Sequence, residues 1–153
     1  MDNPTNTNSR TAAGEAFSSL TVQIFRLNGL LLAAGDALAE PTGQTSARWR
    51  VLAAVEHEPL TVAQIARSWD LARQSVQRVA NVLVKEKLAV YKENPRHRRA
   101  QLLALTPKGR SALVTIQSVQ HEWANKLGAE IGEAELRQAS IILAKVMRAV
   151  AES

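Results

Sequence analysis

Apolar residues recur every three or four positions near the amino terminus, over about 22 residues. They are Phe17, Leu20, Ile24, Leu27, Leu31, Ala34 and Leu38. This spacing predicts a long helix with a narrow apolar seam, as in a coiled coil. Pro41-Thr42-Gly43 ends that helix. Thr45 or Ser46 can cap a second helix, which ends by Pro59. Its predicted buried face is Trp49, Leu52, Ala53 and Glu56.

Two helices with the same stepping are predicted at the carboxy terminus. Thr106-Pro107 is an N-cap followed by proline at the first helical position. The seam of the first helix is Leu113, Ile116, Gln120, Trp123 and Leu127, and that of the second, after Gly132, is Leu136, Ala139, Leu143, Val146 and Val150. So small a monomer cannot easily bury three such seams. We therefore expect an intertwined homodimer, with a self-contained bundle as the alternative.

Between these helices, the segment 60–87 predicts a helix-turn-helix. Thr61 and Gln64 form a capping box, which starts a short helix that ends near Trp69-Asp70. A second helical run, from Ala72 to Lys87, begins only about three residues later.

The second of these helices has two chemically different faces. Its apolar stripe, predicted to face a core, is Val76, Val79, Ala80 and Leu83. Its polar positions carry side chains that can hydrogen-bond base edges in a major groove: Arg73, Gln74, Ser75, Gln77, Arg78 and Asn81. An ordinary solvated polar face is the alternative, and the sequence that follows favours the recognition helix.

The chain next changes to short segments rich in strand-forming residues, 88–93 and 101–105, separated by Asn94-Pro95. The tip between them carries Arg96, Arg98 and Arg99. A hairpin with a cationic tip beside a recognition helix predicts a winged helix. Its arginines would contact phosphates or enter the minor groove.

Charge supports a nucleic-acid partner. The net charge of +5 is uneven, because residues 48–110 hold 13 Lys and Arg against 5 Asp and Glu. A basic segment between mildly acidic ones is typical of a nucleic-acid-binding lobe carried on another scaffold. The chain contains no cysteine, which excludes disulfides and thiol redox sensing. With no uninterrupted apolar run near 18 residues and no signal peptide, we expect a cytoplasmic protein with no membrane partner.

Other classes of function fit the sequence less well. The three histidines, His57, His97 and His121, have no metal-ligand spacing and no catalytic partners in a recognisable order, so we expect neither an enzyme nor a metal or cofactor. A winged-helix module for protein interaction or RNA binding, or one that binds nucleic acid non-specifically without effector control, is the alternative. The arginine-rich tip favours a nucleic acid, and the lack of exposed aromatic platforms disfavours single strands.

Taken together, residues from about Phe17 to Val150 resemble the MarR family of winged helix-turn-helix transcription regulators. The most specific parts are the segments 60–66, 75–78, 97–100 and 105–110. The resemblance implies a mostly α fold with a small β-hairpin wing (α+β), with a winged helix-turn-helix lobe plus an intertwined helical dimerisation region. The expected domains are a flexible tail (1–14), an amino-terminal dimerisation helix (15–43), the DNA-binding lobe (44–106) and carboxy-terminal dimerisation helices (107–153).

The resemblance also implies the function. Family members are homodimeric binders of double-stranded DNA, usually repressors acting at palindromic sites, and a small aromatic or anionic effector often relieves them. Phe25, Arg26 and Trp49 are the candidate effector contacts, each with an alternative role as core or surface. Two positions depart from the family. His97 stands where an aspartate often braces the wing arginine, here Arg99, and Ala72 stands where a serine often caps the recognition helix.

Overall fold

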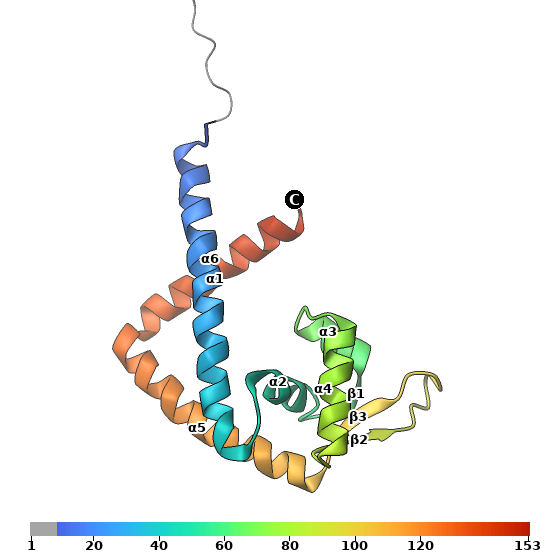
Figure 1. The fold of residues 1–153 in the computed structure, drawn as a ribbon. Helices are drawn as coiled ribbons and strands as arrows, with labels where there is room; N and C mark the ends of the chain where they lie inside the picture. Colours follow the sequence, from blue (N-terminus) through green and yellow to red (C-terminus); the bar gives the residue numbers. More distant parts are fainter. Residues whose placement is uncertain (1–8) are drawn as a thin grey trace, which may run out of the picture. The chain divides into compact units, whose positions relative to one another are not determined.

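The structure is a computed structural model that describes residues 9–153. The described residues form two compact units, one that ends at Ser46 and one from Ala47 to Ser153. Figure 1 shows that helices make up most of both units, with one small sheet. The predicted mostly α fold with a β-hairpin wing is therefore confirmed. Positions 1–8 of the predicted tail lie outside the described residues. The predicted domain boundaries stay predictions.

The first unit is dominated by helix α1, Ala12–Ala39. It begins three residues earlier than the predicted boundary, because the Oγ1 of Thr11 accepts a hydrogen bond from the Gly14 N–H and caps it. A 3-10 turn, η1 (Glu40–Thr42), and Gly43 at φ 69° end the helix. The chain then folds back, and the Ser46 N–H donates to Asp36 Oδ1 at 2.7 Å.

Helix α1 exposes much of its apolar surface in the single chain. Phe25 is 72% exposed and Leu30 69%, and Phe17, Leu27 and Leu31 of the predicted seam are also exposed. By length and mean hydropathy (1.3) the segment Ala12–Thr42 is able to cross a membrane. Core helices of water-soluble proteins meet the same two criteria, so this property alone does not indicate a membrane span.

The second unit contains the winged helix and the carboxy-terminal helices. In chain order its elements are α2 (Ser46–Ala54), β1 (Leu60–Thr61), α3 (Val62–Ser68), α4 (Arg73–Lys85), β2 (Ala89–Lys92), β3 (Leu102–Leu105), α5 (Pro107–Ile131) and α6 (Glu133–Ala151). The antiparallel sheet has the order β1-β3-β2. The two-residue strand β1 was not predicted.

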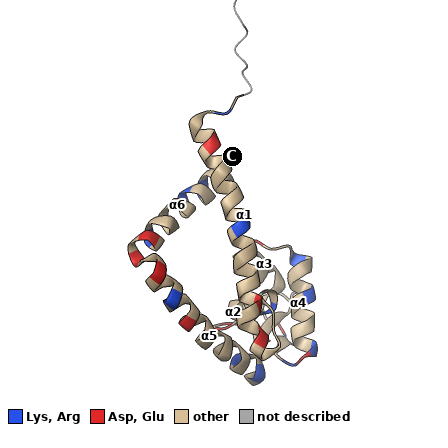
Figure 2. Ribbon diagram, turned by 60° about the vertical axis from the view of Figure 1, so that its left-hand side comes forward, with Lys and Arg blue, Asp and Glu red and all other residues tan. Residues whose placement is uncertain are grey.

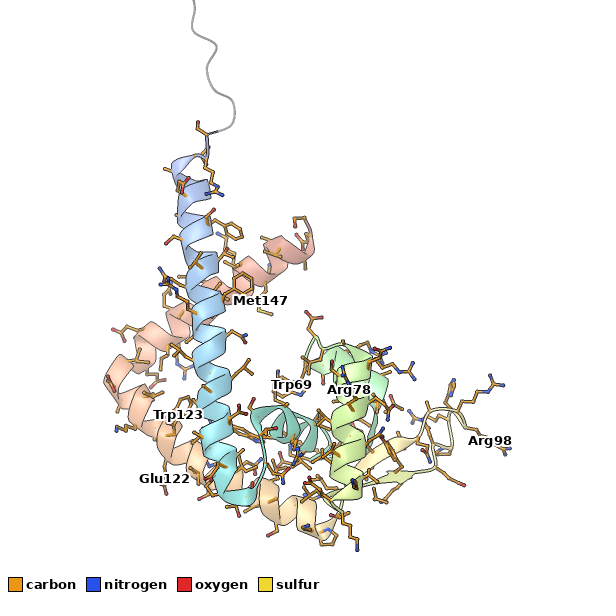
Figure 3. All side chains as sticks on the ribbon, viewed as in Figure 1. Trp69, Arg78, Arg98, Glu122, Trp123 and Met147 are labelled. Carbon is orange, nitrogen blue, oxygen red and sulfur yellow. The ribbon has the colours of Figure 1, made fainter. Side chains whose placement is uncertain are left out.

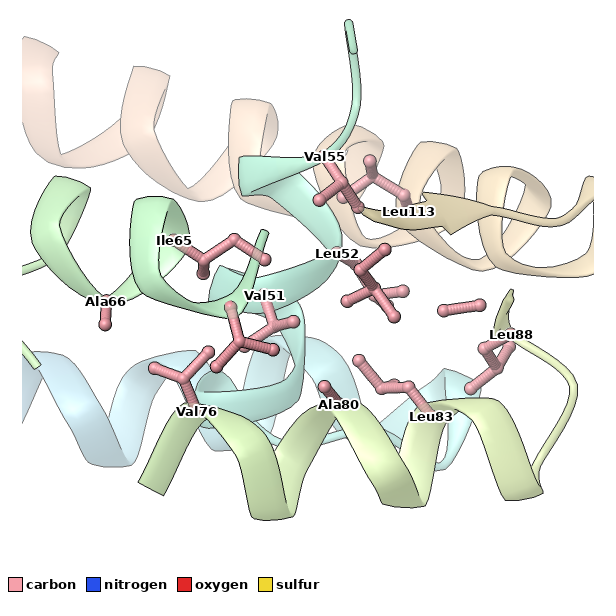
Figure 4. Close-up of a cluster of buried hydrophobic side chains, with 13 residues drawn as sticks. Val51, Leu52, Val55, Ile65, Ala66, Val76, Ala80, Leu83, Leu88 and Leu113 are labelled. Atoms are coloured by element: carbon pink, nitrogen blue, oxygen red, sulfur yellow. The ribbon is translucent and has the colours of Figure 1, made fainter. Parts of the chain in front are cut away.

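One hydrophobic core joins α2, α3, α4, the sheet and the start of α5 (Figure 4). Its buried members are Val51, Leu52, Val55, Val62, Ile65, Ala66, Val76, Ala80, Leu83, Leu88, Ala89, Leu103 and Leu113. The apolar stripe predicted for the second helix is therefore confirmed, with Val79 half-buried beside it.

The buried face predicted for α2 is only partly right. The structure buries Val51, Leu52 and Val55, and Trp49 is half-buried against this core. Glu56 lies beyond the end of the helix at Ala54, where its carboxylate accepts hydrogen bonds from Gln117 Nε2 at 3.0 and 3.1 Å. The core surrounds more than one side of this nine-residue helix, so helical spacing alone does not identify its buried positions.

Helices α5 and α6 meet at Gly132, whose φ of 105° is open to glycine and strained for other residues. The Thr106 cap of α5 is confirmed, since its Oγ1 accepts from the Gly109 N–H at 3.0 Å. Leu113 and Ile116 of the predicted α5 seam are buried, and the later positions are half-buried. Helix α6 has no buried residue, and its apolar side chains, such as Ile141 and Met147, face open space in the single chain.

Candidate nucleic-acid interface

The turn between α3 and α4 brings the two helices together at the expected place. The capping box is complete: Thr61 Oγ1 accepts from the Gln64 N–H, and Gln64 Oε1 accepts from the Thr61 N–H at 2.8 Å. Asp70 turns the chain with φ 50°, a left-handed conformation that aspartate tolerates. The Leu71 N–H then donates to the Ala66 carbonyl at 2.8 Å, closing the turn. Helices α3 and α4 therefore form the predicted helix-turn-helix.

Helix α4 is slightly shorter than predicted. It spans Arg73–Lys85, with Ala72 as its extended N-cap and no side-chain capping bond. Lys87, at φ 62°, has left the helix. The Ala72 carbonyl accepts from the Ser75 and Val76 N–H groups, so backbone bonds alone start this helix.

The outward face of α4 carries the predicted base-reading residues. Arg73, Gln74, Ser75, Arg78 and Asn81 are exposed, and Gln77 is half-buried. Among residues 9–153, the side chains of Arg73, Gln74 and Arg78 have no hydrogen-bond or ion-pair partner of their own. These cationic and amide groups are therefore free to bind a ligand in solution.

Two residues of this face are instead engaged by the wing. Gln77 Nε2 donates to Tyr91 Oη at 2.7 Å and to Asn81 Oδ1 at 3.0 Å. The Tyr91 hydroxyl in turn donates to Asn81 Oδ1 at 2.8 Å. Burial raises the pKa of Tyr91, and the hydrogen bond from Gln77 partly offsets that rise. We call Tyr91, Gln77 and Asn81 the amide cluster; sequence reasoning treated Tyr91 only as a strand former.

The wing is a hairpin of β2 and β3 with a closed tip. Asn94 Nδ2 donates to the Ala100 carbonyl at 2.9 Å, and Asn94 Oδ1 accepts from the Arg96 N–H at 3.0 Å. The predicted turn at Asn94-Pro95 is therefore present. In Figure 3, Arg98 extends from the tip of the wing, and Arg78 lies on α4.

The wing arginines stand without a carboxylate brace. Arg96, Arg98 and Arg99 are exposed, and within the described chain none of their side chains has an ion pair. His97, in place of the aspartate typical of the family, is also exposed. Arg99 lines a groove of about 260 Å³ together with Arg73, and the other lining residues include the amide cluster, Thr61 and Gln101. The groove therefore joins a wing arginine to the recognition helix.

The charges around this groove favour an anionic partner. Figure 2 shows Lys and Arg along α4 and mixed signs on α5. Glu86, at the end of α4, forms an ion pair with Arg48 at 3.1 Å. Its carboxylate therefore does not neutralise the positive charge of the arginines on the α4 face and the wing. A surface with free arginines on both a helix and a hairpin suits the phosphates and base edges of a duplex.

The predicted effector residues fall in different units. Phe25 and Arg26 are exposed on α1 in the first unit, and Trp49 is half-buried in the second. A ligand site involving them stays a prediction. In the described part of the chain, no group of three or more His, Asp or Glu side chains is placed to hold a metal ion.

Comparisons with known proteins agree with this geometry. A sequence model described as "MarR family" matches residues 42–100, which contain α2, both helices of the helix-turn-helix and most of the wing. A relative in Mycobacterium tuberculosis (strain ATCC 25618 / H37Rv), an uncharacterized protein, is 40% identical over 123 residues. The alignment covers 80% of this chain and 86% of the relative.

Solved structures share the fold. A MarR/EmrR family transcriptional regulator from Acinetobacter sp. ADP1 superposes with a TM-score of 0.79 at 22% identity, covering 89% of this chain and 97% of that one. The Staphylococcus aureus MepR–DNA complex gives 0.76 at 18% identity, covering 84% and 96%. Staphylococcus aureus MarR in complex with salicylate and kanamycin gives 0.73 at 17% identity, covering 94% and 99%.

Proposed function

Because this chain belongs to the MarR family of DNA-binding transcription regulators, we propose that it is a sequence-specific repressor that binds a palindromic duplex site as a homodimer. The observation that carries the proposal is the groove in which Arg73 of α4 and Arg99 of the wing lie beside Gln77. Helix side chains read base edges and wing arginines neutralise phosphates, so one surface supplies both parts of duplex recognition.

The free apolar faces of the terminal helices support the homodimer. Helix α6 has no buried residue, and Ile141 is 64% and Met147 71% exposed. An isolated helix of this length is marginal in water, and its stability comes from packing an apolar face. A second copy of the chain has the same exposed apolar faces on α1 and α6, so pairing buries the faces of both copies at once. Such a pair has a two-fold axis, which matches the two-fold symmetry of a palindromic site.

Control by a small effector is the second part of the proposal. A structure of similar fold holds salicylate, an aromatic carboxylate. Trp49 lies half-buried against the winged-helix core, which also contains Val76, Ala80 and Leu83 of α4. An effector releases DNA only if it binds the DNA-incompetent dimer more tightly, by several kcal/mol for a nearly complete switch. Salicylate should therefore weaken operator binding, and Trp49→Ala should blunt this response more than it lowers DNA affinity.

A protection footprint on the DNA upstream of the gene tests the proposal. We expect two protected half-sites about 10 base pairs apart, centre to centre, because a two-fold dimer presents its recognition helices to one face of the duplex. Binding should fall steeply with salt, since arginine–phosphate contacts release counterions. A single short asymmetric site, or no preference among duplexes, would favour a non-specific module over a sequence-specific repressor.

A further inference from the structure

The amide cluster restricts what Gln77 can offer to DNA. Gln77 and Asn81 lie one turn apart on α4, and Tyr91 reaches them from β2. The Nε2 of Gln77 donates to two oxygens, Tyr91 Oη at 2.7 Å and Asn81 Oδ1 at 3.0 Å. A glutamine amide has two N–H donors and one carbonyl oxygen. The Nε2 of Gln77 is thus directed into the amide cluster, and its Oε1 has no hydrogen bond among residues 9–153.

Tyr91 orients this arrangement. Its hydroxyl donates to Asn81 Oδ1 at 2.8 Å and therefore uses a lone pair to accept from Gln77. A tyrosine hydroxyl, whose ordinary pKa is about 10, keeps its proton at neutral pH and is a donor, and burial shifts the pKa of Tyr91 further upward. Asn81 Oδ1 accepts from both neighbours, and the Asn81 Nδ2 donates no hydrogen bond among residues 9–153. The cluster therefore presents one acceptor from Gln77 and donors from Asn81.

This polarity changes the base that Gln77 can recognise. A free glutamine pairs with adenine through two bonds, donating to N7 and accepting from the N6 amine. With Nε2 held against Tyr91 and Asn81, Gln77 offers DNA its Oε1 for the second bond. Both adenine N6 and cytosine N4 supply an amine in the major groove. Guanine and thymine present only acceptors there, which face the Gln77 oxygen unfavourably.

We propose that Tyr91 is a positioning residue that makes Gln77 an acceptor-only reader, so that one position in each half-site favours A or C over G or T. The inference rests on the proposed function and adds a specificity rule to it. Gln74 provides the internal contrast, because it is the same residue type on the same helix and its amide has no hydrogen-bond partner among residues 9–153.

The test uses the full-length protein and a pool of duplexes with randomised sequence. Bound duplexes are sequenced for the wild type, Gln77→Ala, Tyr91→Phe and Val90→Thr. Gln77→Ala identifies the position that Gln77 reads, because preference is lost there. Val90 is exposed on the same strand and outside the amide cluster, so Val90→Thr is the matched control. Binding constants are then measured with each of the four bases at that position.

We expect the wild type and Val90→Thr to favour A or C over G or T about fivefold at this position, the effect of one neutral hydrogen bond. Tyr91→Phe removes one of the two acceptors that hold the Gln77 Nε2, so this ratio should fall towards one. In the DNA-free protein, the side-chain amide resonances of Gln77 and Asn81 should move in the NMR spectrum of Tyr91→Phe and stay in place in Val90→Thr.

Three results would overturn the inference. A preference for G or T at the position that Gln77 reads would show the opposite amide polarity, and this readout needs no variant of Tyr91. An unchanged A-or-C ratio, or unmoved amide resonances, in Tyr91→Phe would show that the hydroxyl does not position Gln77. Each of these leaves duplex recognition standing, whereas a wild-type protein that enriches no sequence would overturn the proposed function as well.

Discussion

The backbone carbonyl oxygen of Leu88 occupies the space that a side chain on Gly109 would need. A Cβ built on Gly109 would collide with that oxygen. The same carbonyl accepts a hydrogen bond from the Thr106 N–H at 3.2 Å, and the Thr106 hydroxyl donates to the Lys87 carbonyl at 2.7 Å. The residues just after α4 and the first turn of α5 are therefore in direct backbone contact, which ties the wing to the carboxy-terminal helices.

Gly109→Ala should destabilise the protein. The methyl group would meet backbone rather than a flexible side chain, so the first turn of α5 must move, at a cost of about 1–3 kcal/mol. Urea unfolding measures this change. Gly29→Ala is the control, because within residues 9–153 no atom outside the backbone of its own helix lies within 4 Å of a Cβ there. It should be neutral or stabilising by up to about 1 kcal/mol through helix propensity. Equal stability of Gly109→Ala and wild type would refute the close contact.

The caps of α3 and α4 should respond in opposite directions. Thr61→Ala removes the side-chain acceptor of the capping box and should cost about 1 kcal/mol of unfolding free energy. Ala72→Ser supplies the capping hydroxyl that α4 lacks and should gain about 0.5–1 kcal/mol. Thermal and urea unfolding of both variants test the pair. A loss of stability in Ala72→Ser would mean that a hydroxyl at this N-cap does not accept a hydrogen bond from the first turn of α4.

The wing and the recognition helix should fail differently in DNA binding. Arg98→Ala with Arg99→Ala should weaken all duplexes and flatten the slope of log K against log salt by about 0.9 for each lost phosphate contact. Arg78→Ala should cost about 1–3 kcal/mol on the specific site and relax the choice of base at one position in each half-site. Titrations at several salt concentrations separate the two. A wing variant with the wild-type slope would show that the tip touches no phosphate.

The apolar faces should hold two chains together. Light scattering at micromolar concentration should give about twice the chain mass of 16.7 kDa. Ile141→Glu should shift the mass towards the monomer, because it places a charge within the exposed apolar face of α6. Lys145→Ala, on the same helix, removes a charge without burying one and serves as the control. A wild-type mass near 17 kDa would exclude the homodimer.

Tyr91 should titrate above its ordinary range. Burial raises its pKa above 10.0, more than the hydrogen bond from Gln77 lowers it. The folded state thus favours the protonated phenol. Its contribution to stability is fully present below the unfolded-state pKa of about 10 and is lost as pH rises through the higher folded value. Tyr91 is the single tyrosine of the chain, so phenolate absorbance near 295 nm reports it directly. A midpoint at or below 10 would contradict the upward shift of the Tyr91 pKa.

Local sequence predicted the parts of the fold that local interactions determine. Thr61 and Gln64 are three residues apart, and their reciprocal bonds need only the first turn of one helix. The two-residue strand β1 is too short to show any alternation, so its pairing with β3 appears only in the folded chain.

The contacts that shape the candidate site depend on pairing between elements. Tyr91 meets Gln77 across 14 positions of sequence, through the packing of β2 against α4. Leu88 approaches Gly109 by a similar route. Periodicity identifies which residues face outward, but it does not say which outward residues touch each other, and this is why the amide cluster was missed.

Thr61 is both the last residue of β1 and the N-cap of α3. Strand and helix therefore follow one another with no connecting residue, and an insertion or deletion there breaks either the pairing with Leu102 or the capping box. The tip between β2 and β3 has no such constraint, because its closure depends on Asn94 and Ala100 at its own base. Over evolutionary time, changes in chain length should collect in the wing tip and be absent at the β1–α3 junction. The length of the wing can thus differ between relatives while the position of the recognition helix is retained.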